Sequence, residues 1–399
     1  MKNILYLIHR IPYPPNKGDK IRSYNILKYL SKENNVFLGT FIDNPDDSQY
    51  KKTVSDLCRE SFFIETDRKK STLKSLSGFF KGTSLTVPYY KDIKMSEWVD
   101  NVLQKNKIDV VYIYSSSMAQ YVYKNPLAED IRKIIDFVDI DSDKWAQYAK
   151  SKSWPLGWVY NRESKKLQDF EKKIAKEFNA SIFVSSTEAE AFKAIIPECS
   201  SRIHYINNGV DTDYFDPARD FDNPYNMEGK KIVFTGAMDY WANVDAVTWF
   251  ANEIFPAIRE YFKDALFYIV GSNPADTVKR LSSDSIVVTG SVYDIRPYIA
   301  HSDLVVVPMR IARGVQNKVL EGMAMGKTVV STYSGYEGIN AKIGEELFVE
   351  NDSVHFSEKV IELLGNTSLK RVGVAARCFI EKSYRWESNL SRLEDLMEK

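Results

Sequence analysis

Cysteine is scarce in this chain, and its three copies lie far apart. Cys58, Cys199 and Cys378 form no C-x-x-C pair and no disulfide framework of the kind that small secreted domains use. We therefore expect a cytoplasmic protein. Long apolar runs are missing as well, since no stretch approaches the ~18 apolar residues that span a bilayer. The opening MKNILYLIHRIP lacks a small-residue cleavage site and is interpreted as a first β-strand.

An excess of charge of one sign is also missing. The 54 Lys+Arg residues balance the 54 Asp+Glu residues, so no global charge argues for nucleic acid. Residues 1–212 carry 33 basic against 27 acidic residues. That surplus could favour an anionic membrane surface or an anionic acceptor, although scattered surface charge is the simpler explanation.

The order of apolar runs predicts an α/β protein with parallel sheets. Short β-branched and aromatic runs alternate with helical patterns throughout. At 399 residues the chain is long enough for two domains. The turn-rich segment 216–230 is interpreted as the linker. We predict a first domain over residues 1–215, a second over 216–380, and a final amphipathic helix within 381–399.

Glycine-rich phosphate loops are absent from the expected places. No G-x-G-x-x-G follows the first strand, where Gly18 stands alone, and no G-x-x-x-x-G-K-[ST] exists. A dinucleotide is therefore disfavoured. Instead, three predicted strands of the second half end in Gly236, Gly271 and Gly290. Glycines there let a backbone approach a ligand, and ligands in open α/β sheets bind outside those strand ends.

The segment PMRIARGVQNKVLEGMAMGKTVV (308–330) carries the clearest chemistry. It predicts a loop and then a helix that begins near Gln316, and the first N–H groups of such a helix suit a diphosphate. Glu321, inside the helix, could accept hydrogen bonds from a ribose diol, with Lys318 on the same face. The alternative is a surface helix with a Lys318–Glu321 salt bridge.

Four segments together resemble a known family. SRIHYINNGVDTDYF and GVQNKVLEGMAMGKTVVST resemble the signatures of retaining glycosyltransferases of family 4. GAMDYWANVDAVTWFANEIFPAIR and DFVDIDSDKWAQYA resemble the bacterial exopolysaccharide and PEP-CTERM (exosortase) sugar transferases within it. The resemblance implies the GT-B fold, in which two Rossmann-like domains face a central cleft. It also implies that the last helix packs back on the first domain.

The resemblance further implies an activity and its partners. We expect a hexosyltransferase-type enzyme of exopolysaccharide biosynthesis that retains anomeric configuration. A UDP- or GDP-type nucleotide sugar would be the co-substrate, with no other cofactor and no metal. The acceptor would be a glycan or a lipid-linked glycan, bound by the first domain. A nucleotide-sugar epimerase of the same shape and a non-catalytic nucleotide-sugar-binding protein are the alternatives.

The donor-binding residues follow from the same resemblance. Glu321 would hold the ribose, the loop before it the sugar and diphosphate, and Val292 the base through its main chain. The full set of donor-binding candidates is Glu321, Gly314, Val315, Gln316, Asn317, Arg310, Gly236, Met238, Asn243, Gly271 and Val292.

The sequence departs from the family pattern where the diphosphate would bind. Arg313 replaces the first glutamate of the family motif, and Ala237 replaces the usual arginine. The usual lysine is absent around residues 242–243. Because an unpaired buried phosphate is costly, we hypothesise that the positive clamp has moved to Arg313 and Lys318, with Arg310 in support. Arg313 and Lys318 are accordingly catalytic candidates.

The first domain supplies the remaining candidates. Asp139 in VDIDSD is the third catalytic candidate, although the segment could simply cap the following helix. Its D-x-D-x-D pattern fails as an EF-hand, because Lys144 stands where the sixth position needs glycine. The acceptor-binding candidates are Gly18, Asp19, Lys20, Arg22 and Asp141.

One further segment shows an amphipathic pattern. DRKKSTLKSLSGFFKG (67–82) places Leu73, Leu76, Phe79 and Phe80 on one helical face among lysines. We expect this face to pack on the core. Peripheral contact with the cytoplasmic membrane is the alternative.

Overall fold

The structure is a computed structural model that describes residues 1–15, 17–150, 152–312, 314–366 and 369–398. The chain divides into two compact units. The N-terminal unit comprises residues 1–207 together with 390–399, and the C-terminal unit comprises residues 208–389. The sequence placed the boundaries at 215/216 and 380/381. No helix of the described residues is long and apolar enough to cross a membrane.

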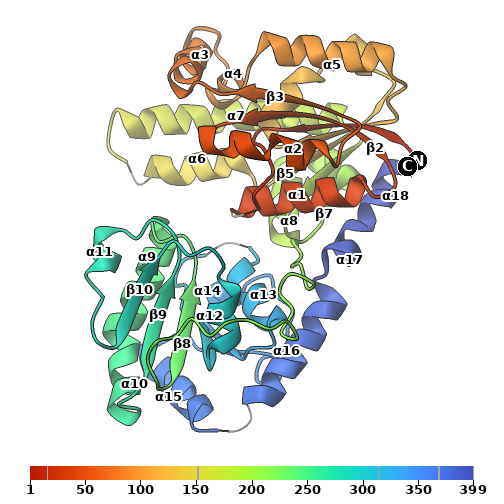
Figure 1. Ribbon diagram of the computed structural model, residues 1–399. Helices are drawn as coiled ribbons and strands as arrows, with labels where there is room; N and C mark the ends of the chain where they lie inside the picture. Colours follow the sequence, from red (N-terminus) through yellow and green to blue (C-terminus); the bar gives the residue numbers. More distant parts are fainter. Residues whose placement is uncertain (16, 151, 313, 367–368, 399) are drawn as a thin grey trace. The chain divides into compact units, whose positions relative to one another are not determined.

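The N-terminal unit is built on a parallel sheet of seven strands in the order β3-β2-β1-β4-β5-β6-β7 (Figure 1). The strands are β1 (Asn3–Ile8), β2 (Asn35–Ile42), β3 (Glu60–Glu65), β4 (Val110–Tyr114), β5 (Arg132–Val138), β6 (Ala180–Phe183) and β7 (Ile203–Tyr205). The α-helices are α1 (Gly18–Leu30), α2 (Lys51–Ser55), α3 (Arg68–Phe80), α4 (Thr86–Tyr89), α5 (Ile93–Lys105), α6 (Asp141–Lys150), α7 (Leu156–Glu177), α8 (Ser186–Ile195) and α18 (Arg392–Glu398). Short 3-10 turns are η1 (Pro45–Tyr50), η2 (Ser116–Tyr121), η3 (Pro126–Ala128) and η4 (Pro197–Arg202).

Strand alternation sorts the side chains of β1 between the two faces of this sheet. Leu5 and Leu7 belong to an apolar cluster that includes side chains of α5 and α7. Tyr6 points to the other face, where its hydroxyl donates to the carbonyl of Ser23 in α1 at 3.2 Å. Apolar runs of β-branched residues therefore form a strand that is buried on both faces, as parallel sheets require.

The end of the chain completes the N-terminal unit. Leu393 in α18 is fully buried. The ammonium of Lys2 donates to the carbonyl of Met397 at 2.9 Å, and the Arg132 guanidinium donates to the carbonyl of Leu396. The last helix thus packs on strands that the beginning of the chain forms.

The C-terminal unit has a parallel sheet of six strands in the order β10-β9-β8-β11-β12-β13. The strands are β8 (Lys231–Thr235), β9 (Leu266–Val270), β10 (Ile286–Gly290), β11 (Leu304–Val307), β12 (Val329–Ser331) and β13 (Phe348–Val349). The helices are α9 (Trp241–Trp249), the π-helical turn η5 (Phe250–Ile254), α10 (Phe255–Tyr261), α11 (Asp276–Lys279), α12 (Arg296–His301), α13 (Asn317–Ala324), α14 (Tyr333–Tyr336), α15 (Ser353–Leu364), α16 (Leu369–Ser383) and α17 (Trp386–Leu390).

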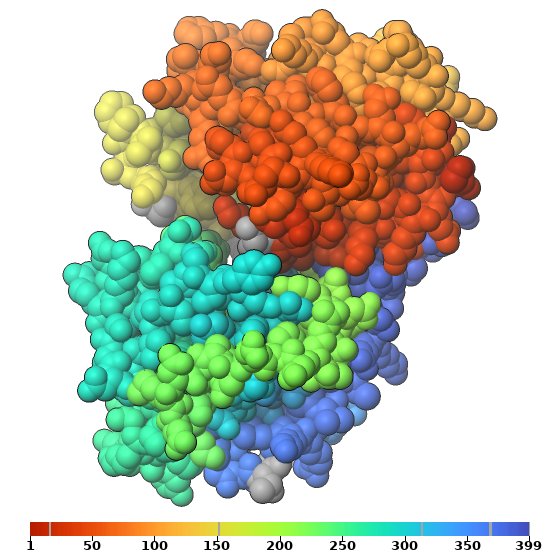
Figure 2. Space-filling model, in the orientation of Figure 1, coloured from red at the N-terminus to blue at the C-terminus, as the bar shows by residue number. Residues whose placement is uncertain are grey.

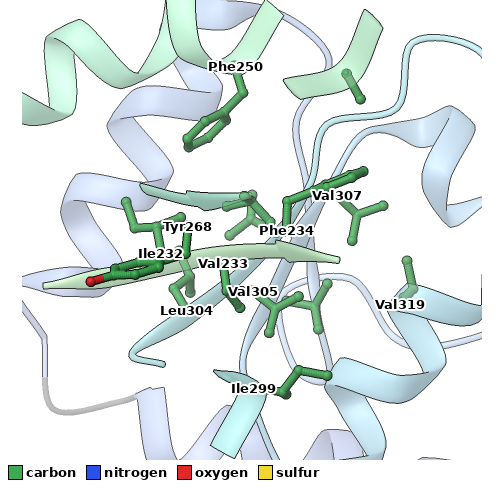
Figure 3. Close-up of a cluster of buried hydrophobic side chains, with 14 of the residues drawn as sticks. Ile232, Val233, Phe234, Phe250, Tyr268, Ile299, Leu304, Val305, Val307 and Val319 are labelled. Atoms are coloured by element: carbon green, nitrogen blue, oxygen red, sulfur yellow. The ribbon is translucent and has the colours of Figure 1, made fainter. Parts of the chain in front are cut away.

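The core of this unit lies on both sides of β8 and β11. Phe234 and Val305 come from the two strands, Phe250 from the π-helical turn, and Val319 from α13 (Figure 3). All four side chains are at most 1% exposed. The α/β fold class predicted from the alternating pattern is confirmed, with two parallel sheets each covered by helices.

Helix α3 differs from the expectation. Its large apolar residues were expected to pack on the core, but Leu73, Leu76 and Phe80 are 69%, 44% and 93% exposed. Phe79 of that face is half-buried and stacks on Trp158 of α7. The pattern indicates an amphipathic helix correctly but does not say which face points inward.

Candidate functional site

Strand order locates the candidate site in the C-terminal unit. From β8 the chain adds β9 and β10 on one side and then returns to β11 on the other. The carboxyl ends of β8 and β11 therefore form a topological switch point, where open α/β sheets bind ligands. Strand β8 ends there and is followed by Gly236, and the loop that leads from β11 into α13 begins there.

Two glycines bring the ends of β8 and β9 together. A Cβ on Gly271 would lie 1.6 Å from the carbonyl oxygen of Gly236, so no side chain fits at that position. A Cβ on Gly236 would lie 2.8 Å from Nδ2 of Asn243 and 3.5 Å from Cε of Lys318. Glycine at 236 therefore leaves open a space that Asn243 and Lys318 border.

Two asparagine side chains of this unit, one of them bordering this space, have a buried amide oxygen with no hydrogen-bond donor among the described residues. Asn243 of α9 donates through Nδ2 to the carbonyl of Ala237 at 2.8 Å, which orients its side chain. Among the described residues, Oδ1 of Asn243 and Oδ1 of Asn317 are buried without a partner. Buried acceptors are nearly always satisfied in native proteins, so these oxygens can receive donors from a ligand.

Lys318 and Glu321 lie on the same helix, α13, and both are half-buried. The alternative of a salt bridge is wrong, because within the described part of the chain the two side chains do not form an ion pair. Nζ of Lys318 lies 5.4 Å from the centroid of the Phe234 ring. Burial lowers the pKa of Lys318 to about 8, against the effect of Glu321. Burial raises the pKa of Glu321 to about 7, against the effect of Lys318.

The start of α13 lacks a side-chain cap. Gln316 is the N-cap residue, but its side chain donates to the carbonyl of Gly314 at 3.0 Å instead of capping the helix. Val315 lies beside Gly338, since a Cβ added to Gly338 would lie 3.2 Å from Cγ2 of Val315. The N–H groups of the first turn of an α-helix carry partial positive charge. Together with Lys318, they can bind an anion.

The arginines of the expected clamp differ in their surroundings. Arg310 donates through Nε to Oδ2 of Asp245 at 3.0 Å and makes a second bond to the same carboxylate. Its guanidinium also lies 5.4 Å from the centroid of the Trp249 ring. Asp245 was missed from the sequence, because an acid on α9 gives no local sign of a partner 65 positions away. Arg313 lies outside the described residues.

Two other donor candidates occupy different surroundings. Met238 is fully buried in the core, and its N–H and carbonyl are bonded to Ser272 and Ala275 at 2.7 and 3.0 Å. Met238 therefore has a structural role here, which corrects the expectation of ligand contact. Val292 follows Gly290 at the end of β10 and is half-buried against the core.

The acceptor-binding candidates of the N-terminal unit lie partly at its surface and partly in its interior. Asp19 lies at the β1/β4 switch point of that sheet, where its carboxylate accepts from Arg10 at 2.6 Å and its carbonyl from Tyr114 at 2.9 Å. Lys20 is 4% exposed and pairs with Asp47 at 2.6 Å. Gly18 begins α1 and has open space around it.

Arg22, which we predicted to bind the acceptor, is part of a buried network. It is 1% exposed, and its Nε donates to Oδ2 of Asp136 at 2.9 Å. Tyr112 donates to the same oxygen at 3.2 Å. One local sign in the sequence could have indicated this pair. Asp136 lies inside the apolar strand KIIDFV, and a carboxylate in a buried strand needs a cation or a hydrogen-bond donor.

Asp139 and Asp141 share one cation at the end of β5. Nζ of Lys144 lies 2.8 Å from Oδ2 of Asp139 and 3.4 Å from Oδ1 of Asp141. Burial raises the pKa of Asp141, and Lys144 opposes that shift. Beneath them, Ser142 donates through N and Oγ to the buried carboxyl of Glu171 on α7, at 3.2 and 2.5 Å. Glu171, which sequence reasoning missed, therefore holds the first turn of α6.

Comparison with known proteins relates the C-terminal unit to one family. Residues 229–366, which include the candidate site, match the family model of group 1 glycosyl transferases. An uncharacterized 44.6 kDa protein in the cps region of Klebsiella pneumoniae is 22% identical, with 96% of this chain and 97% of that protein aligned.

Two solved structures have the same fold. Anabaena HepE in complex with UDP-glucose is 13% identical, with 99% of each chain covered and a TM-score of 0.65. WaaG, a glycosyltransferase involved in lipopolysaccharide biosynthesis, is 15% identical, with 99% of each chain covered and a TM-score of 0.66.

The two Rossmann-like units therefore make a GT-B fold. The protein is a glycosyltransferase, as the family match over its C-terminal unit and its fold together indicate. The placement in family 4 and the link to exosortase systems stay predictions.

Proposed function

We propose that this glycosyltransferase transfers a sugar, with retention of anomeric configuration, from a nucleotide-diphosphate donor to a glycan or lipid-linked glycan of the cell surface. The observation that carries the proposal is the group at the β8/β11 switch point. Lys318 and Glu321 are half-buried and form no ion pair with each other. Among the described residues, the Asn243 oxygen, which borders the same space as Lys318, lacks a donor. A cation, a carboxylate and an amide oxygen together suit a diphosphate joined to a hydroxyl-rich sugar.

Each of these groups would then have one role toward the donor. Lys318 and the first turn of α13 would bind the diphosphate, and Glu321 would accept hydrogen bonds from the ribose diol. The main chain around Gly290 and Val292 would contact the base. As the bond from the sugar carbon to the phosphate oxygen breaks, negative charge grows on the leaving diphosphate. Lys318 and the helix N-terminus would stabilise that charge in the transition state.

Retention can proceed without a protein base. In front-face attack, the acceptor hydroxyl attacks the sugar carbon on the side from which the diphosphate leaves. The new glycosidic bond forms as the carbon–oxygen bond to phosphate breaks, and the departing phosphate oxygen takes the hydroxyl proton. In this scheme Asp19 and Asp139 of the N-terminal unit would orient the acceptor, while Lys144 holds Asp139.

The relatives support the donor and the setting of this proposal. HepE binds UDP-glucose, WaaG acts in lipopolysaccharide biosynthesis, and the Klebsiella relative is in a cps region. We infer a UDP- or GDP-type donor and a role in polysaccharide biosynthesis from them. The free thiols Cys58, Cys199 and Cys378 suit a reducing cytoplasm.

A thermal-shift screen against UDP-, GDP-, ADP- and dTDP-sugars tests the proposal. The matched donor should raise the melting temperature of the full chain selectively, because binding stabilises the folded state by mass action. Lys318→Met should lower the affinity for that donor about 10- to 100-fold, as expected for loss of a charge-assisted hydrogen bond. Lys342→Met, at an exposed lysine of the same unit, is the matched control and should leave donor affinity unchanged.

The product identifies the stereochemistry. Transfer to a glycan acceptor, followed by NMR of the new anomeric centre, should show the configuration of the donor. An inverted product would contradict retention but not transfer. A nucleotide sugar that is isomerised without any acceptor would instead favour an epimerase.

A further inference from the structure

Helix α3 packs on the N-terminal unit through small residues. Ser71 and Gly78 are its buried positions, and a Cβ on Gly78 would lie 2.3 Å from the carbonyl oxygen of Ser84. Leu73, Leu76 and Phe80, spaced at i, i+3 and i+7, point to solvent instead. Surface helices usually turn such a face to the core. An outward apolar face of this kind marks a binding surface.

Large apolar side chains are also exposed at the beginning of α7 and just before it. Trp154, Leu156 and Trp158 are 82%, 51% and 57% exposed. Phe79 of α3 stacks on Trp158 with ring centroids 6.3 Å apart. Arg162 covers the Phe79 ring at 4.6 Å and donates to the carbonyl of Gly78 at 2.8 Å.

These contacts join the end of α3 to the first two turns of α7. We name the resulting face the α3–α7 surface, made of Leu73, Leu76, Phe80, Trp154, Leu156 and Trp158. In the space-filling view the α3 segment, in orange, lies at the molecular surface (Figure 2).

The charges around the α3–α7 surface are predominantly positive. Residues 67–82 contain five basic residues and one acid, Asp67, a difference of 5 − 1 = +4. Lys150 and Lys152 stand beside Trp154, with no acid between residues 148 and 156. Lysines next to exposed tryptophan, phenylalanine and leucine are the composition of segments that lie in a membrane interface. A protein partner would need acidic residues and apolar pockets that match this face, whereas an anionic bilayer offers both features at once.

A lysine-lined groove of about 360 Å³ adjoins the end of α3. Lys81, Lys91, Lys166 and Lys173 line it, against one acid, Asp169. Among the residues that the structure describes, none of these four lysines is in an ion pair. Polar groups of Thr83 and Gln120 also line the groove. Four unpaired cations around one hollow suit a phosphate group.

We propose that the α3–α7 surface docks on an anionic lipid bilayer. The apolar side chains enter the boundary between headgroups and acyl chains, and the lysine groove receives a headgroup phosphate. The proposal adds a membrane partner to the proposed function and does not depend on donor binding, which involves residues of the C-terminal unit. It explains why α3 exposes its large apolar residues and buries its small ones.

Sedimentation with lipid vesicles tests the docking. The full chain should bind vesicles of equal parts phosphatidylcholine and phosphatidylglycerol, and bind phosphatidylcholine alone far more weakly. Added salt should weaken the binding by screening the lysines. The triple variant L73S/F80S/W154S should reduce partitioning by tenfold or more, because each large apolar side chain contributes about tenfold. K166Q/K173Q should also reduce it by about tenfold or more, since each surface lysine contributes about fivefold.

Matched variants on the C-terminal unit control for general loss of apolar or basic surface. V354S/V374S removes two apolar side chains that are 60% and 67% exposed, and K279Q/K342Q removes two exposed lysines. Both should bind vesicles like the unmodified protein. All variants should keep their melting temperature and its rise with donor, which separates failed docking from failed folding or failed donor binding.

Three results would overturn the docking proposal. The first is equal binding to both kinds of vesicle, or binding to neither. The second is a concentration-dependent dimer that L73S/F80S/W154S abolishes while vesicles remain unbound, which would make the surface a protein interface. The third is full release from anionic vesicles by inorganic phosphate at constant ionic strength, which would make the groove a site for soluble phosphate.

Discussion

At the scale of single residues, burial sets the ionisation of the candidate donor site. Lys318 has a pKa lowered to about 8 and Glu321 one raised to about 7, both chiefly by burial. Each side chain is therefore close to losing its charge near neutral pH. A diphosphate near Lys318 favours its charged form, so donor binding and ionisation must be coupled.

This coupling predicts a bell-shaped pH dependence of donor affinity. Affinity should rise through about pH 7 as Glu321 loses its proton and becomes a better acceptor for the ribose. It should fall above about pH 8 as Lys318 loses its charge. Calorimetric titration of the matched donor across this range measures both limbs. Glu321→Gln should remove the acidic limb and Lys318→Met the basic one; a wild-type profile in either variant would contradict the assignment.

The buried pair of Arg22 and Asp136 affects the stability of the fold. Burial raises the pKa of Asp136 against the opposing effect of Arg22, so this carboxylate depends on its partner. Arg22→Met should lower the free energy of unfolding by about 3–5 kcal/mol, because it leaves an uncompensated carboxylate. Urea denaturation measures the loss.

The double variant R22M/D136N is the control for that loss. It removes both charges and should recover most of the stability, since a neutral pair has a smaller desolvation cost. If the double variant were as unstable as the sum of the single variants, shape and not charge would explain the effect.

At the scale of elements, α7 organises its neighbours through two buried carboxyl groups. Glu163 accepts from the backbone N–H of Thr86 at 2.9 Å and from its hydroxyl at 2.7 Å, at the start of α4. Glu171 accepts from Ser142 at the start of α6. The helix thereby positions the segment that carries Asp139 and Lys144.

Glu171 should make the stability of the N-terminal unit depend on pH. Burial raises its pKa to about 8 in the folded protein, whereas an unfolded glutamate titrates near ~4.3. The contribution of Glu171 to the free energy of unfolding is present in full below its pKa in the unfolded state. It is lost as pH rises through its pKa in the folded state. Stability should therefore fall between about pH 5 and 8, by a few kcal/mol.

Glu171→Gln should flatten that dependence, because the amide keeps an oxygen acceptor for Ser142 without a titrating charge. Melting temperatures across the same pH range measure the slope. Glu190→Gln, at an exposed acid on α8, should keep the wild-type slope. An unchanged slope in Glu171→Gln would show that another group titrates.

At the scale of the whole molecule, the N-terminal unit is discontinuous and the C-terminal unit is not. Residues 390–399 belong with residues 1–207, and Leu390, Leu393, Leu396 and Met397 are all buried. Lys2 and Arg132 bond to carbonyls of α18. The first unit is therefore complete only after the second has been synthesised.

Truncation after Asn389 should consequently destabilise one unit only. Scanning calorimetry should show the N-terminal transition at lower temperature, with the donor-stabilised C-terminal transition unchanged. Leu393→Ala should act in the same direction by about 2–5 kcal/mol, through lost packing and a cavity. Asp395→Ala, at an exposed position of the same helix, should have little effect. A shift of both transitions would mean that the units unfold together.

Much of this organisation could be predicted from sequence pattern. Alternating apolar runs predicted the two parallel sheets, and the glycines after β8 and β9 and at the end of β10 led us to predict where a ligand would approach. Glu321 and Lys318 were predicted to bind the donor because they follow a strand, a loop and a glycine within one short segment. These signals are local, and the physics behind them is the geometry of strands and helix ends.

Other features required the tertiary structure, because their causes are distant in sequence. The pairing of Arg310 with Asp245, of Arg22 with Asp136, and of Ser142 with Glu171 joins segments 29 to 114 positions apart. Which face of α3 points outward depended on Gly78 meeting Ser84. The sequence by itself determined the α/β architecture and the placement of Lys318 and Glu321 on one helix after a strand. Only the tertiary structure decided which charges are buried and which form ion pairs, because burial and pairing depend on neighbours that folding supplies.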